Sequence, residues 1–105
     1  MSVLTVTKDN FENDVIKSEK KVLLDFWASW CGPCRMVAPT VDAISEEHPE
    51  YLVGKINVDD EPELAEAFGI ESIPTLVVIK DGKAIAGAIG VQSKEQILEL
   101  LETEE

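Results

Sequence analysis

The chain's two cysteines, Cys31 and Cys34, stand three positions apart where a strand pattern gives way to a helix pattern. The apolar run Val22–Trp27 is rich in branched and aromatic residues, which is typical of a buried β-strand. Apolar residues then recur at spacings of four and three along 37–44, which indicates an amphipathic helix. Any fold for this chain must therefore place the cysteine pair at the junction between a buried strand and a helix, with Cys31 at the start of the helix and Cys34 one turn inside it.

A helix that begins at Cys31 makes the two thiols chemically useful. Residues three apart in a helix lie about 5–6 Å from each other, within reach of a disulfide. Pro33 suits the first helical turn because its missing N–H needs no partner there. Free backbone N–H groups and the positive helix end stabilise a thiolate at Cys31 and lower its pKa. We therefore expect Cys31 to be the nucleophile and Cys34 the resolving thiol.

Other chemistries of a Cys-x-x-Cys pair fit this chain less well. A structural zinc site needs four ligands, and two cysteines with one histidine cannot supply them, so no metal is expected. Covalent haem attachment needs a histidine directly after the second cysteine, where Arg35 stands. A soft-metal chaperone and a purely structural disulfide stay open as alternatives. Gly32 and Pro33 stiffen the loop that a chaperone would need free, and so small a ring restrains the unfolded chain weakly. Reversible thiol–disulfide exchange is the favoured hypothesis.

Length and charge limit the remaining possibilities. A chain of 105 residues has room for one domain with a modest core, and we expect a single domain over residues 1–105. The net charge of −12 argues against nucleic acid and anionic membranes as partners. No basic segment followed by an apolar one is evident at the N-terminus, so we expect no signal peptide. Two cysteines in such a chain suit the reducing cytoplasm, where disulfides are transient and catalytic.

Strand and helix patterns alternate along the whole chain. Strands are predicted at 4–7, 22–27, 52–58, 75–79 and 84–89, and helices starting near Asp9, Cys31, Pro62 and Ser93. Asp9 with Glu12, and Ser93 with Gln96, have the spacing of a capping box. The alternation predicts an α/β fold, a mixed sheet with helices on both faces. The patterns do not give the order of the strands.

Asp25 is the most unusual charge in the chain because it lies inside the apolar segment 23–27. If helices cover both faces of this strand, the carboxyl group is buried and desolvation raises its pKa toward neutrality. Such an acid can accept the proton that Cys34 must lose before it attacks a mixed disulfide. The alternative is an aspartate that reaches water at the strand end. Lys55, in the apolar run 53–56, is either its partner or an exposed strand lysine.

The segment Asp25-Phe-Trp-Ala-Ser-Trp-Cys-Gly-Pro-Cys-Arg35, with Ala38-Pro39 beyond it, resembles the active-site signature of the thioredoxin family. Further similarities follow in the same order at Lys55–Asp59, Ile73–Thr75, Lys80–Lys83 and Gly90. The resemblance implies a thioredoxin fold, with a central mixed five-stranded sheet flanked by four helices. It also implies that Lys55 lies near Asp25 and that Asp25 relays the proton of Cys34 through water.

The resemblance further implies where a substrate binds. Ile73, Pro74 and Thr75 would face the cysteines and offer backbone groups to an extended substrate. Pro74 would be cis, although most X-Pro bonds are trans. Trp30, beside the nucleophile, would be a partly exposed docking residue, and Gly90 and Val91 would extend the apolar surface around it. Val91 stands where an alanine is common in the family, which bears on the choice of partner.

We therefore expect a general protein-disulfide reductase that acts on disulfide-containing proteins as a monomer. The resemblance implies that it binds no cofactor and receives electrons from NADPH through thioredoxin reductase. A disulfide isomerase or oxidase of the same fold, and a redox-independent binding module, are the alternatives. Gly32-Pro33 argues against the first, because relatives with histidine before the second cysteine are better oxidants. Replacing both cysteines by serine would test the second.

Overall fold

In the described part of the computed structural model, five strands form one mixed sheet with the order β1-β3-β2-β4-β5. Strands β1 and β2 run parallel to β3, whereas β4 is antiparallel to both β2 and β5. The structure describes residues 3–104; Met1, Ser2 and Glu105, at the ends of the predicted domain, lie outside the described residues. The strands are β1 (Leu4–Thr5), β2 (Lys21–Trp27), β3 (Tyr51–Asn57), β4 (Thr75–Lys80) and β5 (Lys83–Ile89). The predicted mixed sheet is confirmed, and β2, which leads into the cysteines, lies at its centre.

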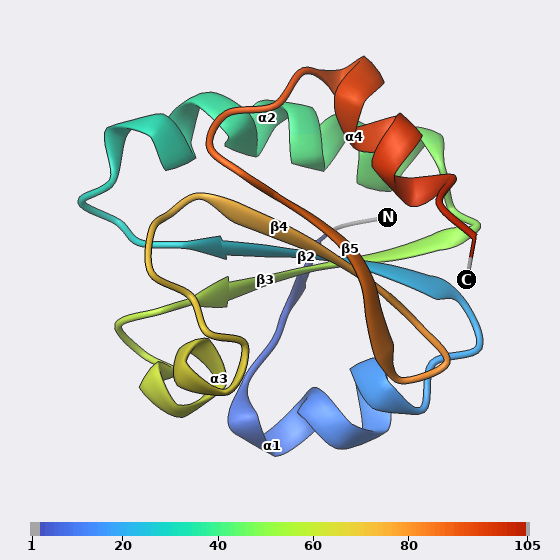
Figure 1. The fold of residues 1–105 in the computed structure, drawn as a ribbon, viewed down its shortest axis with the longest axis horizontal. Coiled ribbons are helices and arrows are strands. Elements are labelled where there is room, and N and C mark those ends of the chain that lie inside the picture. The colour runs from blue at the N-terminus through green and yellow to red at the C-terminus, as the bar shows by residue number, and fades with distance from the viewer. Residues whose placement is uncertain (1–2, 105) are drawn as a thin grey trace.

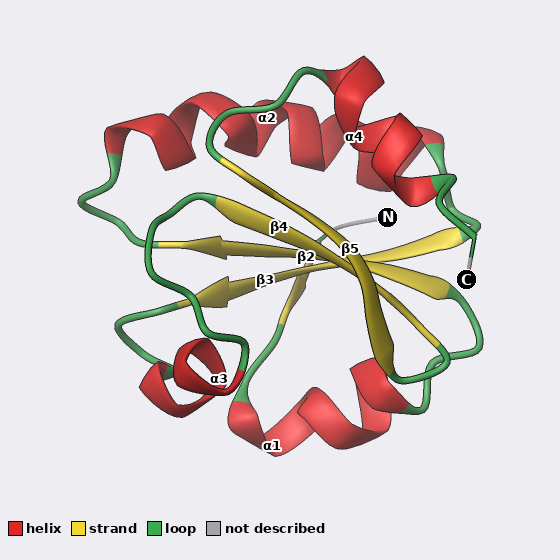
Figure 2. Cartoon of the chain, viewed as in Figure 1, coloured by secondary structure: helices red, strands yellow, loops and turns green. Residues whose placement is uncertain are grey.

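Helices cover both faces of the sheet (Figures 1 and 2). Helices α2 (Gly32–Glu47) and α4 (Lys94–Leu101) lie on one face. The other face carries α3 (Pro62–Ala67) and α1 (Lys8–Asn10), which continues as a π-helical segment, η1 (Phe11–Ile16). The expected arrangement of four helices around five strands is therefore confirmed, with the first helix part α and part π. Within residues 3–104, no helix is both long enough and apolar enough to span a membrane.

The alternation of side chains along β2 decides which residues face the helix that carries the cysteines. Leu24 and Phe26 are fully buried and pack in the core on the α1 and α3 side of the sheet. Leu23 packs instead with residues of α2 and α4, including Val37 and Ile97. Since successive side chains of a strand point to opposite faces, Asp25 shares the face of Leu23 and points toward α2.

The start of the first helix differs from the prediction. Thr7, not Asp9, is the N-cap: its hydroxyl accepts the N–H of Asn10 at 3.4 Å, and the Asn10 side chain accepts the N–H of Thr7 at 2.8 Å. The predicted capping box of Asp9 and Glu12 is wrong because the backbone is already helical two residues earlier than expected. Strand β1 ends at Thr5, two residues earlier than predicted.

The capping box of the last helix is confirmed. The Ser93 hydroxyl accepts the N–H of Gln96 at 3.1 Å, and the Gln96 side chain accepts the N–H of Ser93 at 2.8 Å. This fixes the start of α4, directly after the loop that contains Gly90 and Val91.

Candidate active site

Cys31 is the N-cap residue of α2, and its side chain meets the free end of the helix. The Cys31 sulfur accepts the backbone N–H of Cys34 at 3.1 Å, as a capping side chain does. Gly32 and Pro33 occupy the first two helical positions and are both exposed. The two cysteines are joined by a disulfide, with their Cα atoms 5.3 Å apart. The strand-to-helix junction predicted from the sequence is thus the position of the thiols.

The loop that precedes β4 lies against Cys31. The carbonyl oxygen of Ile73 is 3.8 Å from the Cys31 sulfur, and the bond between Ile73 and Pro74 is cis. Gly90 donates its N–H to the Pro74 carbonyl at 2.8 Å, which ties the end of β5 to the same loop. The Thr75 hydroxyl donates to the backbone carbonyl of Ser72, at the start of the loop, at 2.6 Å. The structure therefore brings together the three segments expected to form a substrate surface.

Large apolar side chains are exposed near this junction. Trp30 is 67% exposed and Val91 is 45% exposed. The Trp30 indole donates its N–H to Asp59 at 2.8 Å, which fixes the ring beside the cysteines. Met36 and Ile89, each 68% exposed, are two further apolar residues that the sequence did not single out. Their signal was available: Met36 is two residues beyond Cys34, and Ile89 directly precedes Gly90.

Asp25 is buried at the centre of the sheet, with 4% of its surface exposed. Its neighbour in the parallel pairing of β2 with β3 is Lys55. Burial raises the pKa of Asp25 from 3.8 to about 6, the charge of Lys55 opposes this rise, and the charge of Asp42 reinforces it. Oδ1 of Asp25 has no hydrogen-bond partner among the described residues.

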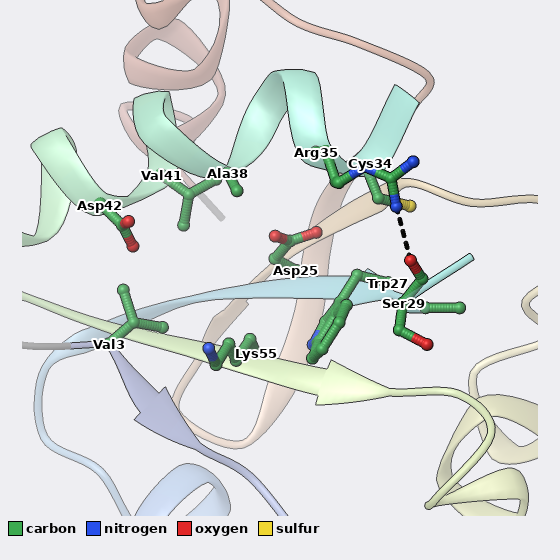
Figure 3. Close-up of a pocket in the computed structure, with 11 residues that line it drawn as sticks. Val3, Asp25, Trp27, Ser29, Cys34, Arg35, Ala38, Val41, Asp42 and Lys55 are labelled. Atoms are coloured by element: carbon green, nitrogen blue, oxygen red, sulfur yellow. Dashed lines mark hydrogen bonds between the residues drawn. The ribbon is translucent and has the colours of Figure 1, made fainter. Parts of the chain in front are cut away.

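A cavity of about 330 Å³ connects Asp25 to the second cysteine (Figure 3). It lies between α2 and strands β2 and β3, and the carboxyl group of Asp25 points into it. Cys34 lines the same cavity, whereas Cys31 does not. Lys55 also lines it, with its ammonium group 5.5 Å from the centre of the Trp27 ring. The two thiols therefore face different surroundings: Cys31 faces the Ile73 loop, and Cys34 faces the buried carboxyl group.

Two charged residues of α2 that the sequence did not predict also line this cavity. Arg35 donates to the carbonyl of Ser29 at 2.6 Å and so closes the turn between β2 and α2. Asp42 lines the cavity from an exposed position on the same helix. The signal for Asp42 was its spacing, because Cys34, Ala38 and Asp42 are four residues apart and must share one face of the helix.

No metal centre is visible in the part of the chain that the structure describes. Among residues 3–104, no three histidine, cysteine, aspartate or glutamate side chains come together as metal ligands would.

The family model described as Thioredoxin matches residues 2–103. The chain belongs to the thioredoxin family. It is 50% identical to the thioredoxin of Porphyra purpurea over 98 residues, which cover 92% of each chain. It is 44% identical to the thioredoxin of Acidithiobacillus ferridurans over 104 residues, 98% of this chain and 96% of the relative. It is also 44% identical to thioredoxin 1 of Synechococcus elongatus over 98 residues, 92% of each.

Thioredoxins are protein-disulfide oxidoreductases, and this chain holds the required pair of cysteines at disulfide distance. Its activity is dithiol–disulfide exchange on disulfide substrates, chemistry for which the family needs no prosthetic group. The reaction is carried by the Cys31–Cys34 pair, which cycles between disulfide and dithiol.

Proposed function

We propose that this member of the thioredoxin family is a general protein-disulfide reductase in which Cys31 attacks and Cys34 resolves. The Cys31 thiolate attacks one sulfur of a substrate disulfide, and the other substrate sulfur leaves as a thiolate. The Cys34 thiolate then attacks the Cys31 sulfur and releases the second substrate thiolate. The substrate gains two electrons, and the protein is left with the Cys31–Cys34 disulfide.

The observation that carries this assignment is the hydrogen bond from the Cys34 N–H to the Cys31 sulfur, at 3.1 Å. A sulfur at the N-cap lies at the positive end of the helix, which stabilises the thiolate over the thiol. Cys34 lies one turn inside the helix and lines the cavity that holds Asp25, whereas Cys31 does not line it. Cys31 is thus the thiol placed for attack on a partner, and Cys34 is placed for attack on Cys31.

Asp25 is the proposed acceptor of the Cys34 proton. Both residues line one cavity, so a proton can pass between them without crossing apolar core. A carboxyl group whose pKa burial raises to about 6 is a stronger base than an ordinary carboxylate and is still largely ionised at pH 7. Lys55, its register partner, supplies the positive charge that keeps the ionised form accessible in a buried site.

A substrate is proposed to bind in extended form along Ile73, Pro74 and Thr75, with its disulfide against Cys31. The Ile73 carbonyl beside the Cys31 sulfur is a backbone acceptor for such a segment. Trp30, Gly90 and Val91 lie around the same place and supply apolar contacts. A substrate that is held by backbone hydrogen bonds and apolar contacts is recognised by its shape more than by its sequence. Such recognition suits a reductase that acts on many proteins.

Trapping of the mixed disulfide tests the two cysteine roles. Cys34→Ser should accumulate a covalent complex with a disulfide protein through Cys31, because no thiol remains to resolve it. Cys31→Ser should form no such complex and should lose reductase activity. Complex formation by Cys31→Ser at the rate of Cys34→Ser, read on non-reducing gels, would reverse the assignment.

Electrons are proposed to come from NADPH through a thioredoxin reductase, in the cytoplasm. The test is NADPH consumption by the protein, a thioredoxin reductase and a disulfide protein together. Turnover that requires all three components supports the proposal, and failure of the oxidised protein to accept electrons contradicts it. Equilibration against glutathione, with free thiols counted, separates a reductase from an isomerase or oxidase, which would hold its thiols reduced in a more oxidising mixture.

A further inference from the structure

Asp42 lies at the solvent-exposed end of the cavity, whereas Asp25 lies at its buried end. Asp25 and Asp42 both line the cavity, but Asp25 is 4% exposed whereas Asp42 is an exposed residue of α2. In Figure 3 the carboxyl groups of both residues lie beneath α2, with Cys34 toward one end of the row and Asp42 toward the other. Asp42 is therefore a carboxylate at the mouth of the cavity that holds the proposed proton acceptor.

Among the described residues, few ionisable groups besides Asp42 face Asp25. The neighbouring strand β4 offers the apolar Leu76 as its register partner, and the Arg35 guanidinium is bound to the Ser29 carbonyl. The ionisable side chains that line the cavity with Asp25 are Lys55 from β3, and Cys34, Arg35 and Asp42 from α2. Lys55 and Asp42 are thus charges of opposite sign on opposite walls of the cavity.

We propose that Asp42 is a positioning residue, whose carboxylate at the cavity mouth holds the proton on Asp25 against the opposing charge of Lys55. The inference rests on the proposed role of Asp25. The negative charge of Asp42 disfavours a second negative charge on Asp25. The low dielectric constant of the protein around the cavity screens this repulsion less than water would. The direction agrees with the charge of Asp42 raising, and that of Lys55 lowering, the pKa of Asp25.

The proposal concerns one proton transfer, from the Cys34 thiol to the Asp25 carboxylate, while Cys34 displaces the substrate sulfur from Cys31. No electron passes through Asp42. Its charge makes Asp25 a stronger base, so the step keeps its driving force near neutral pH. Without that charge, Asp25 would ionise at lower pH and take up the proton less readily.

The resolving step can be measured alone. The dithiol protein is mixed in a stopped-flow instrument with an aromatic disulfide whose released thiolate absorbs visible light. The first thiolate reports attack by Cys31, and the second reports resolution by Cys34. Resolution is intramolecular, so a change in net charge cannot alter it through diffusional steering. The midpoint of the acid limb of its pH–rate profile is the quantity compared among variants.

Asp42→Asn should move that midpoint to lower pH, with a change on the order of twofold in the ionised fraction of Asp25 on the acid side. Because Asp42 is exposed to solvent, the shift should shrink in about 1 M salt, where the Debye length is only about 3 Å. Glu46→Gln is the matched control, since it removes the same charge one turn further along α2 from a residue that does not line the cavity. Asp42→Glu keeps the charge and should keep the original midpoint.

A shift with Asp42→Asn that neither Glu46→Gln nor Asp42→Glu reproduces supports the proposal. Equal shifts with Asp42→Asn and Glu46→Gln would overturn it, because net charge would then be the cause. No shift with Asp42→Asn, while Asp25→Asn removes the acid limb, would overturn the role of Asp42 and leave the proposed function intact. If the acid limb survives Asp25→Asn, the proton role of Asp25 fails, and the role of Asp42 fails with it.

Discussion

Asp25 couples the stability of the fold to pH. Its pKa is about 6 in the folded protein, against an ordinary value of 3.8, because burial disfavours the charged form. The folded state therefore binds a proton more tightly than the unfolded state. Ionising Asp25 therefore lowers the free energy of unfolding. This loss of stability is absent below about pH 3.8, grows between pH 3.8 and 6, and is constant above about pH 6. The difference corresponds to about 3 kcal/mol at neutral pH.

Asp25→Asn should consequently stabilise the protein at pH 7.5, by up to about 3 kcal/mol, while it slows the resolving step. The amide keeps the shape of the carboxyl group but never carries its charge. Near pH 4 the two proteins should unfold at similar urea concentrations, because the native carboxyl group is then protonated. Asp14→Asn, at an exposed position of η1, is the control and should change stability by less than about 0.5 kcal/mol at either pH. An equal gain with Asp25→Asn at pH 4 and pH 7.5 would contradict the desolvation account.

Single residues were predictable where their own segment decides their position. The apolar strand favoured a buried Asp25 over one that reaches water, and the structure confirms the burial. The position of Cys31 at the start of the helix followed from the change of pattern after it. The pairing of Asp25 with Lys55 joins residues on separate strands, so the sequence alone left Lys55 open and only the family resemblance placed it. To predict Asp42 as a cavity residue, one needs both its helical spacing from Cys34 and the knowledge of which face of the helix covers the sheet.

At the scale of elements, β3 has no room for a side chain at Gly54, where it lies between β1 and β2. Gly54 is paired with Leu4 of β1 and with Leu24 of β2. A Cβ atom built at this position would lie 2.7 Å from Cγ2 of Val6. Val6 is 1% exposed and has a stiff, branched side chain, so it cannot turn aside. A glycine is therefore required at position 54, because the side chain of Val6 occupies the space that a Cβ atom would need.

Gly54→Ala should lower the free energy of unfolding by about 1–3 kcal/mol through overpacking, in urea denaturation at pH 7. The matched control is Gly32→Ala, because a Cβ atom at Gly32 meets nothing within 4 Å. Its stability should stay within about 0.5 kcal/mol of the original or rise, since alanine favours a helix over glycine. Equal losses from both substitutions would mean that backbone freedom, and not the contact with Val6, sets the cost.

Elements were predicted well in kind and less well at their ends. Both capping boxes had the same i and i+3 spacing, and only the one at Ser93 was placed correctly. At the first helix Thr7 and Asn10 carry the box, and the helix continues as the π-helical η1. Spacing cannot choose between overlapping caps, because the choice depends on where β1 ends against β3.

At the scale of the whole molecule, the net charge of −12 should steer partners. An acidic surface attracts a basic partner before contact and repels an acidic one, and salt removes both effects. Two disulfide peptides of one sequence, flanked by lysines or by glutamates, make this measurable. The lysine peptide should be reduced on the order of tenfold faster at low salt, with the ratio approaching one in about 1 M salt. A ratio that does not depend on salt would assign the preference to local contacts.

The order of the strands is the part of the fold that the residue patterns could not give. Period-2 patterns identify strands but do not say which strands are neighbours, and β1 and β3 pair across some 50 residues. The resemblance to the thioredoxin family supplied the five-stranded sheet in advance, and the structure confirms it.

Because the two thiols have different surroundings, electrons and protons leave the molecule by separate routes. None of Trp30, Ile73, Pro74, Gly90 and Val91 lines the cavity that holds Asp25. A protein docked over these residues would cover the route by which electrons leave Cys31 and would leave the mouth of the cavity uncovered. Protons could then equilibrate with water while the partner stays in place, so exchange would not have to wait for the complex to open.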